Sequence, residues 1–198
     1  MTRELVMIAA GCCLLATSCA TSRTVTRQDP STVMDLHYRF DEDDARQTAD
    51  AMIEDALSHP WLDSWVEDHD RLPVIVIGAI ENQTSDYIDT ELFTKQFERA
   101  LLNSGRVRLV ASEFQRETIR MERQEISQWA RQDTRKQQHH EIGADLILIG
   151  RVGENAEVSR RGTSRLQYYQ VNLELVNIES NEKLWIGERQ IEKLMVDS

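Results

Sequence analysis

The chain has 198 residues, of which 34 are acidic and 23 are lysine or arginine, so its net charge is -11. A surface of that sign repels phosphate backbones, which argues against nucleic acid as a partner. Apolar residues make up 40% and charged residues 29%, the balance of an ordinary globular domain, and the length predicts a single domain.

Residues 1–18 are typical of an export signal that ends before a cysteine. Arg3 gives a positive start, and the apolar run from Leu5 to Ala16 is too short to span a membrane. Small residues directly precede Cys19, as in the bacterial lipobox. We therefore expect a lipoprotein signal peptide over residues 1–18 and lipidation of Cys19 by acyl chains such as palmitate.

Two alternatives stay open for this segment. Cys12 follows the small residues 9–11 and could be lipidated in place of Cys19. The segment could also be an ordinary secretory signal in which the cysteine is incidental. Ala20, rather than an aspartate, follows Cys19, and by the rule for enteric bacteria this predicts the outer membrane, with the protein facing the periplasm.

All three cysteines lie in this N-terminal segment. The rest of the chain can therefore form neither a disulfide framework nor a cysteine-based metal site, and we expect no cofactor. Residues 20–37 are mostly polar and carry few branched apolar side chains. We expect the lipidated cysteine and a short flexible tether over residues 19–37, and a globular αβ domain over residues 38–198.

A helix is predicted from the acidic cluster at residues 41–44, because negative charge is favourable at a helix N-terminus. Apolar residues follow at three- and four-residue spacing, and Pro60 stands after the end of the pattern. Trp61, Leu62 and Trp65 are predicted to form a buried staple beneath the sheet. An exposed aromatic contact patch is the alternative for these side chains.

The next segments alternate between strand and helix patterns. Residues 72–80 form a β-branched apolar run, which predicts a central strand buried on both faces. A helix capped by Asp89 or Thr90 follows and ends at Gly105, and residues 106–111 supply a second strand.

A long charged segment then separates this strand from the next one. Ser112 and Gln115 form a capping-box pattern for a helix that runs toward Gln137. The apolar positions of this helix are widely spaced, so we expect part of it to project from the body of the domain.

Three further strands are predicted in the C-terminal part, over residues 143–152, 165–178 and 184–191. The first reads as a buried strand, the second alternates between apolar and polar side chains, and the third pairs back on the second as an antiparallel hairpin. The predicted order is αβαβαβββ, a single α/β domain with a mixed sheet of about four to five strands and helices packed on it.

Few residues suggest chemistry. His139, His140 and Glu141 could indicate a metal cluster, but adjacent histidines on one helix point about 100° apart and lack the spacing of a zinc helix, so we prefer a solvated helix end and expect no metal. Nothing sets His59 and His69 apart from ordinary surface histidines. The sequence has no serine-nucleophile motif, P-loop or GxGxxG. We therefore expect no catalytic residues and a protein that is not an enzyme.

Three segments resemble the LpoB-type penicillin-binding-protein activators: residues 88–112, the run GADLILIGRV at 143–152, and YYQVNLELVNIESNEKLWIGERQIEK at 168–193. The resemblance covers roughly residues 73–193. It implies a fold similar to the N-terminal domain of TolB. It also implies an outer-membrane lipoprotein, monomeric and not catalytic, that docks on a small regulatory domain of a class A penicillin-binding protein and activates this bifunctional peptidoglycan synthase.

A docking face is expected on the wet side of the sheet and on the loop before the first capped helix, since aromatic and arginine side chains dominate interface hot spots. The candidates are Tyr87, Arg151, Tyr168 and Trp185. The alternative is that neighbouring loops simply cover Tyr168 and Trp185.

Two other functions are considered. A structural component of an envelope secretion or transport assembly is the main alternative, and such a component should self-associate. A periplasmic small-molecule binder is the third possibility, which a large apolar pocket would favour.

Overall fold

The computed structural model describes residues 40–158 and 164–196, which belong to one compact unit. The predicted signal peptide, Cys19, Cys12 and the tether lie outside these residues, so the expectations for them stay predictions. Within the described part, the helices are α1 (Glu42–Ser58), α2 (Trp61–His69), α3 (Thr90–Ser104) and α4 (Glu113–Trp129). The strands are β1 (Val74–Asn82), β2 (Arg108–Leu109), β3 (Leu146–Val158), β4 (Ser164–Asn177) and β5 (Lys183–Val196).

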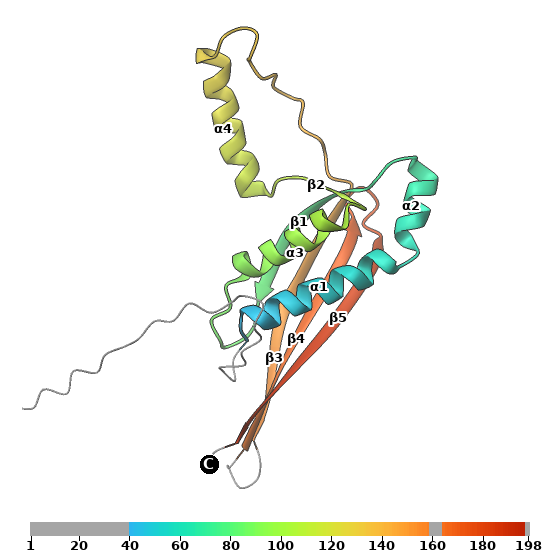
Figure 1. The fold of residues 1–198 in the computed structure, drawn as a ribbon, viewed down its shortest axis with the longest axis vertical. Coiled ribbons are helices and arrows are strands. Elements are labelled where there is room, and N and C mark those ends of the chain that lie inside the picture. The colour runs from blue at the N-terminus through green and yellow to red at the C-terminus, as the bar shows by residue number, and fades with distance from the viewer. Residues whose placement is uncertain (1–39, 159–163, 197–198) are drawn as a thin grey trace, which may run out of the picture. The chain divides into compact units, whose positions relative to one another are not determined.

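The described strands form one mixed sheet in the order β2-β1-β3-β4-β5. Strands β2 and β3 run parallel to β1, whereas β4 and β5 continue as an antiparallel meander. Figure 1 shows α1 and α3 side by side on one face of this sheet, while β3, β4 and β5 extend beyond them. This arrangement confirms the predicted α/β class, the mixed sheet and the helices packed on it.

The core lies between the sheet and the helices α1 and α3. Tyr169, Leu173 and Leu146 of the sheet meet Phe93 and Phe97 of α3, and all five are almost completely inaccessible to solvent. The rings of Phe93 and Phe97 are 4.7 Å apart, a spacing at which aromatic pairs attract each other. Burial of these large side chains is the main source of the fold's stability.

The predicted staple is buried, but it belongs to a helix that the predicted order lacks. Trp61, Leu62 and Trp65 all lie in the core cluster, and the indole of Trp61 donates to the carbonyl of Ala56 at 2.7 Å. They sit on α2, which starts directly after Pro60. Proline fits a helix start because its missing amide proton is not needed there. The order is therefore ααβαβαβββ.

Two other boundaries differ from the prediction. Helix α4 ends at Trp129 and not near Gln137, since after Ala130 the polar residues 131–138 have no apolar side chain to pack and a short turn forms at Arg131. Strand β2 has only two residues, opposite Val74 and Ile75. The expectation that α4 projects is met, because none of its residues is buried.

Strand β1 contains an extra residue. Ile77 is level with Leu148, but Ile80 is level with Gly150, so one residue too many is accommodated between them. Such a bulge shifts the strand's alternation by one residue and returns Ile80 to the core. Gly78 is needed here because a Cβ would come within 2.8 Å of both Ile147 and Ile149.

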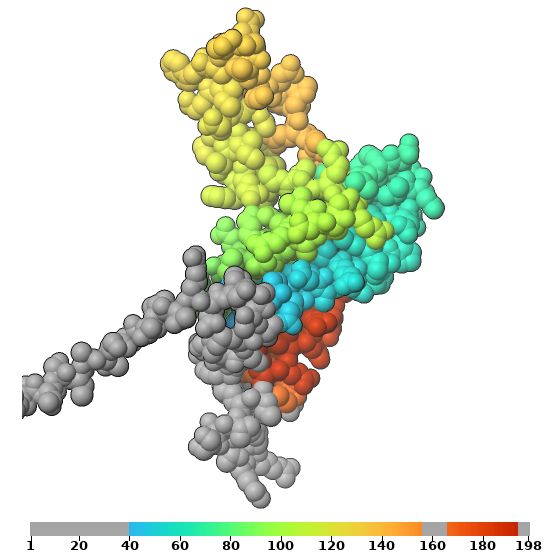
Figure 2. Space-filling model, viewed as in Figure 1, coloured from blue at the N-terminus to red at the C-terminus, as the bar shows by residue number. Residues whose placement is uncertain are grey.

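Residues 110–145 leave the sheet and return to almost the same level of β1. Leu109, before this excursion, is level with Ile75 on one side of β1, and Leu146, after it, is level with Ile75 on the other side. We call α4 together with the returning residues 130–145 the arm. Figure 2 shows the arm as a lobe that stands apart from α1 and α3.

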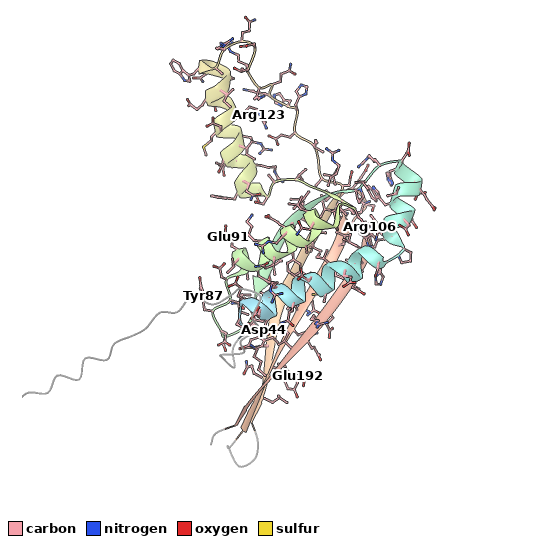
Figure 3. All side chains as sticks on the ribbon, in the orientation of Figure 1. Asp44, Tyr87, Glu91, Arg106, Arg123 and Glu192 are labelled. Carbon is pink, nitrogen blue, oxygen red and sulfur yellow. The ribbon has the colours of Figure 1, made fainter. Side chains whose placement is uncertain are left out.

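A buried ion-pair cluster joins the first and last described elements. The ammonium of Lys193 on β5 lies 3.0 Å from Asp41 and 2.5 Å from Asp44, and only 6% of the lysine side chain is exposed. Asp41 and Asp44 also form the capping box of α1, in which each carboxylate accepts from the other residue's amide. Asp44 is labelled at the start of α1 in Figure 3.

We expect Lys193→Met to lower the free energy of unfolding by about 2–3 kcal/mol, because it leaves two poorly solvated carboxylates without their cation. Urea denaturation followed by circular dichroism measures this. Lys183→Met is the matched control, since Lys183 is also on β5 and pairs with Glu174 of β4 but is 58% exposed, and it should cost about 1 kcal/mol or less. Equal losses in both variants would contradict the role given to Lys193.

Candidate functional site

The face of the sheet that points away from α1 and α3 is the candidate site, and we call it the open sheet face. Alternate side chains of β3, β4 and β5 point to it because successive residues of a strand alternate between faces. A polar depression of about 540 Å³ lies on it. Its lining residues are Gln83, Arg151, Gly153, Glu154, Asn155, Tyr168, Gln170, Asn172 and Gln190.

This surface is rich in hydrogen-bonding groups. Arg151 is exposed, and its side chain makes no hydrogen bond or ion pair with any other described residue. Side-chain amides surround it, and Glu81 is its cross-strand neighbour on β1. The other end of the open sheet face is apolar. Ile147 and Ile149 are half-buried there, and Ile186 is 65% exposed. A guanidinium, amides and isoleucines suit the recognition of another protein better than catalysis.

On the helix side of the sheet, two hydrogen bonds fix the loop between β1 and α3. Ser85 donates its amide to Glu154 at 2.6 Å, and the hydroxyl of Tyr169 donates to Asp86. Burial raises the pKa of Tyr169 above its ordinary range, and the hydrogen bond to Asp86 adds to this, so the hydroxyl stays protonated. The anchored loop leaves Tyr87 90% exposed.

The structure brings two of the four predicted docking residues together. Arg151 and Tyr168 line the same depression on the open sheet face. Tyr87 lies elsewhere, beside a small groove of about 190 Å³ that includes Phe40 and Leu92 at the starts of α1 and α3 (Figure 3). Arg151 and Tyr168 therefore share one surface, and Tyr87 belongs to another.

The prediction that Trp185 lies on the wet side of the sheet is wrong. Trp185 is level with the buried Leu175, so strand alternation turns it toward α1. Its indole donates to Asp55 at 2.9 Å and its side chain is almost fully buried. The ring lies over Gly187, where a Cβ would come within 2.1 Å of it. The sequence Trp-Ile-Gly was the available signal, because a large residue and a glycine two positions apart lie on the same face of a strand.

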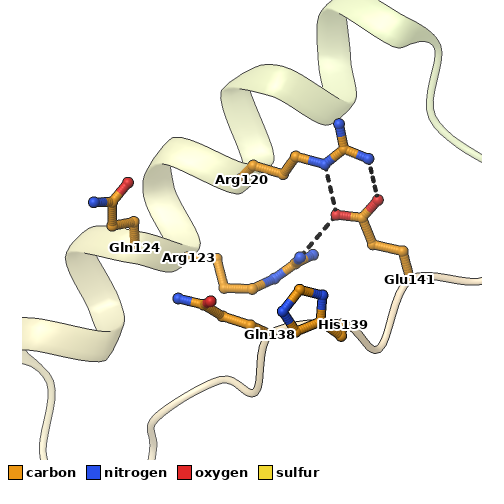
Figure 4. A pocket seen from close by; sticks show the side chains of 6 residues that line it. All are labelled: Arg120, Arg123, Gln124, Gln138, His139 and Glu141. Carbon is orange, nitrogen blue, oxygen red and sulfur yellow. Dashed lines mark hydrogen bonds and ion pairs between the residues drawn. The ribbon is translucent and has the colours of Figure 1, made fainter.

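A second depression, of about 650 Å³, lies within the arm. Arg120 donates two hydrogen bonds to Glu141, at 3.0 and 2.7 Å, and Arg123 donates a third at 2.8 Å (Figure 4). The hydrogen bonds from Arg120 and then Arg123 lower the pKa of Glu141 to about 2. Both guanidiniums are thus already engaged by a carboxylate within the chain.

His139 and His140 do not form a helix end, because α4 stops ten residues earlier and both lie in the returning loop. His139 has a φ of 61°, in the left-handed region. The described residues contain no cluster of three or more histidine, cysteine or carboxylate side chains that could hold a metal ion.

Sequence reasoning missed the residue that ties α2 to the sheet. Asp145 accepts two hydrogen bonds from Arg71, at 2.6 and 2.7 Å, and one from the amide of Val74 at 2.8 Å. The hydrogen bonds from Arg71 hold the pKa of Asp145 below its ordinary value. A lone carboxylate directly before an apolar strand was the available signal.

Comparison with protein families gives one match. The family described as peptidoglycan-synthase activator LpoB matches residues 44–191. A search of curated proteins found no match. Among the described helices, none combines the length and the apolar character needed to cross a membrane.

Solved structures resemble the chain at low identity. The LpoB C-terminal domain from Escherichia coli is 15% identical, with a TM-score of 0.45, and the match covers 75% of this chain and 98% of that one. The NMR structure of E. coli LpoB is 15% identical, with a TM-score of 0.44 and coverage of 94% and 89%. Lipoprotein GNA1162 from Neisseria meningitidis is 13% identical, with a TM-score of 0.39 and coverage of 61% and 83%.

The low pKa of Glu141 predicts a pH window for the arm. A carboxyl whose pKa falls on folding contributes stability above its unfolded value of 4.5, and this is lost as the pH falls toward 2. We expect carboxyl NMR to titrate Glu141 near 2. We also expect Glu141→Gln to speed amide hydrogen exchange in residues 131–145 at neutral pH. Glu113→Gln, at the exposed start of α4, is the control and should leave this exchange unchanged.

Proposed function

The chain belongs to the LpoB family of peptidoglycan-synthase activators, and we propose that it is a lipid-anchored regulator that binds and activates a class A penicillin-binding protein. The family match over residues 44–191 is the observation that carries this proposal. In this proposal the catalytic groups belong to the synthase, and the present chain supplies a binding surface.

The open sheet face is the proposed docking surface. Arg151 has no partner among the described residues, and the amides around it can donate and accept hydrogen bonds without burying a charge. Tyr168 adds an aromatic ring to the same depression. Arginine and tyrosine are the residue types that most often carry binding energy at interfaces.

Activation follows from differential binding. A regulator raises the synthase's activity only if it binds the active conformation more tightly than the inactive one, and by no more than that difference. A rigid surface serves this purpose, because little ordering is needed on contact. The sheet provides such a surface, since β3, β4 and β5 are hydrogen-bonded to one another over their full lengths.

The anchor sets where the regulator can act. We propose that lipidated Cys19 holds the protein in the outer membrane, facing the periplasm, with residues 20–37 as the tether. A segment of that length reaches at most about 60 Å when fully extended, at ~3.3 Å per residue. The domain would then meet the part of the synthase that lies within this distance of the membrane.

We expect residues 20–198 to bind a class A penicillin-binding protein from the same cell and to raise its rate of glycan polymerisation. Arg151→Ala combined with Tyr168→Ala should weaken binding about tenfold or more. Arg189→Ala is the matched control, because Arg189 is exposed on the helix side of β5 and is level with the buried Val171. Stimulation that survives the double substitution would exclude the docking surface, and no binding by the wild type would exclude the function.

We expect Cys19→Ala to abolish lipidation and release the protein from the membrane fraction, because the acyl chains supply the membrane affinity. Metabolic labelling with a fatty acid and fractionation measure both effects. Cys12→Ala is the control and should keep the lipid. Labelling that is lost with Cys12→Ala and retained with Cys19→Ala would move the anchor to Cys12.

A further inference from the structure

Helix α4 carries large apolar side chains that nothing in the described structure covers. Phe114 is 78% exposed, Met121 58% and Trp129 81%, and Ile119 is 47% exposed. Met121 and Trp129 follow Phe114 by seven and fifteen residues, which places these three side chains on one side of the helix. We call Phe114, Met121 and Trp129 the apolar face of the arm.

The opposite side of α4 is engaged within the chain. Arg116 donates to the carbonyl of Ala111 at 3.0 Å, and Arg120 and Arg123 bind Glu141 (Figure 4). Ser112 and Gln115 close a capping box at the helix start. The contacts with Glu141 fix the returning loop on the arginine side of α4 and leave the apolar face pointing away from it.

The charge that accompanies the apolar face is negative. Glu122 and Glu125 lie eight and eleven residues after Phe114, on the same side of α4, and both are exposed. Neither makes an ion pair with another described residue. Arg120 and Arg123 lie on the opposite side of α4, where both bind Glu141.

This charge decides between possible occupants. A second copy is disfavoured, because pairing two α4 helices through their apolar faces would bring Glu122 and Glu125 of both copies together. The net charge of -11 on each chain would add to the repulsion. An apolar patch bordered by lysine or arginine matches the surface in both respects.

We propose that the apolar face of the arm is a second docking surface, and that its occupant is an apolar, lysine- or arginine-bordered patch on the synthase. This inference rests on the proposed function, since it names a second contact with the same partner. The arm and the open sheet face then contact the partner at two separate places. A two-point contact fixes the orientation of the regulator as well as its position.

The test measures binding of residues 20–198 to the class A penicillin-binding protein at low and at high salt. Met121→Ala with Trp129→Ala should weaken binding about tenfold. Glu122→Lys with Glu125→Lys should also weaken it and reduce its salt dependence. The control is Glu67→Lys with Asp68→Lys on α2, which makes the same change in charge at two exposed positions and should bind like the wild type.

Each outcome is decisive. Wild-type affinity and salt dependence in both arm variants, with unchanged circular dichroism, would overturn the arm as a docking surface while the proposed function stands. Failure of the wild type to bind would overturn both. Sedimentation of the wild type as an oligomer that the Met121 and Trp129 substitutions dissociate would replace the synthase by a second copy and overturn the proposed occupant.

Discussion

The helices α1 and α3 cover one face of the sheet, and the packing of that single layer is the constraint from which the rest follows. Strand residues beneath this layer are buried, as Tyr169, Leu173 and Leu175 show. Their neighbours along β4 point the other way and carry polar side chains. Arg151 and Tyr168 lie on this other face, so strand alternation separates the side chains of the core from those of the proposed docking surface.

Polar contacts hold the edges of this arrangement where apolar packing ends. Lys193 joins the far part of β5 to the start of α1, and Asp145 joins the start of β3 to Arg71 beside α2. Glu154 and Tyr169 fasten the loop that carries Tyr87. Each contact joins segments distant in sequence, so each restrains the position of one element relative to another. Surface ion pairs within a single helix, such as Arg46 with Asp43, do not have this effect.

Much of the fold could be predicted because its signals are local. The capping boxes at Asp41 and Ser112, the end of α3 at Gly105 and the apolar strands all depend on near neighbours. The errors arose where distant contacts decide. Trp185 is turned inward by the register of β4 and β5, and the end of α4 depends on the absence of packing beyond Trp129. The same limit applies to the site, where Arg151 and Tyr168 could be named but their separation from Tyr87 could not.

The place at which the arm joins the sheet has a consequence for variation. Leu109 and Leu146 are both level with Ile75, one on each side of β1, so the ends of the excursion are only two strand spacings apart, roughly 10 Å. A link of a few residues could bridge that distance without shifting any strand pair. Insertions and deletions within residues 110–145 can therefore change the length of the arm without disturbing the pairing of the strands.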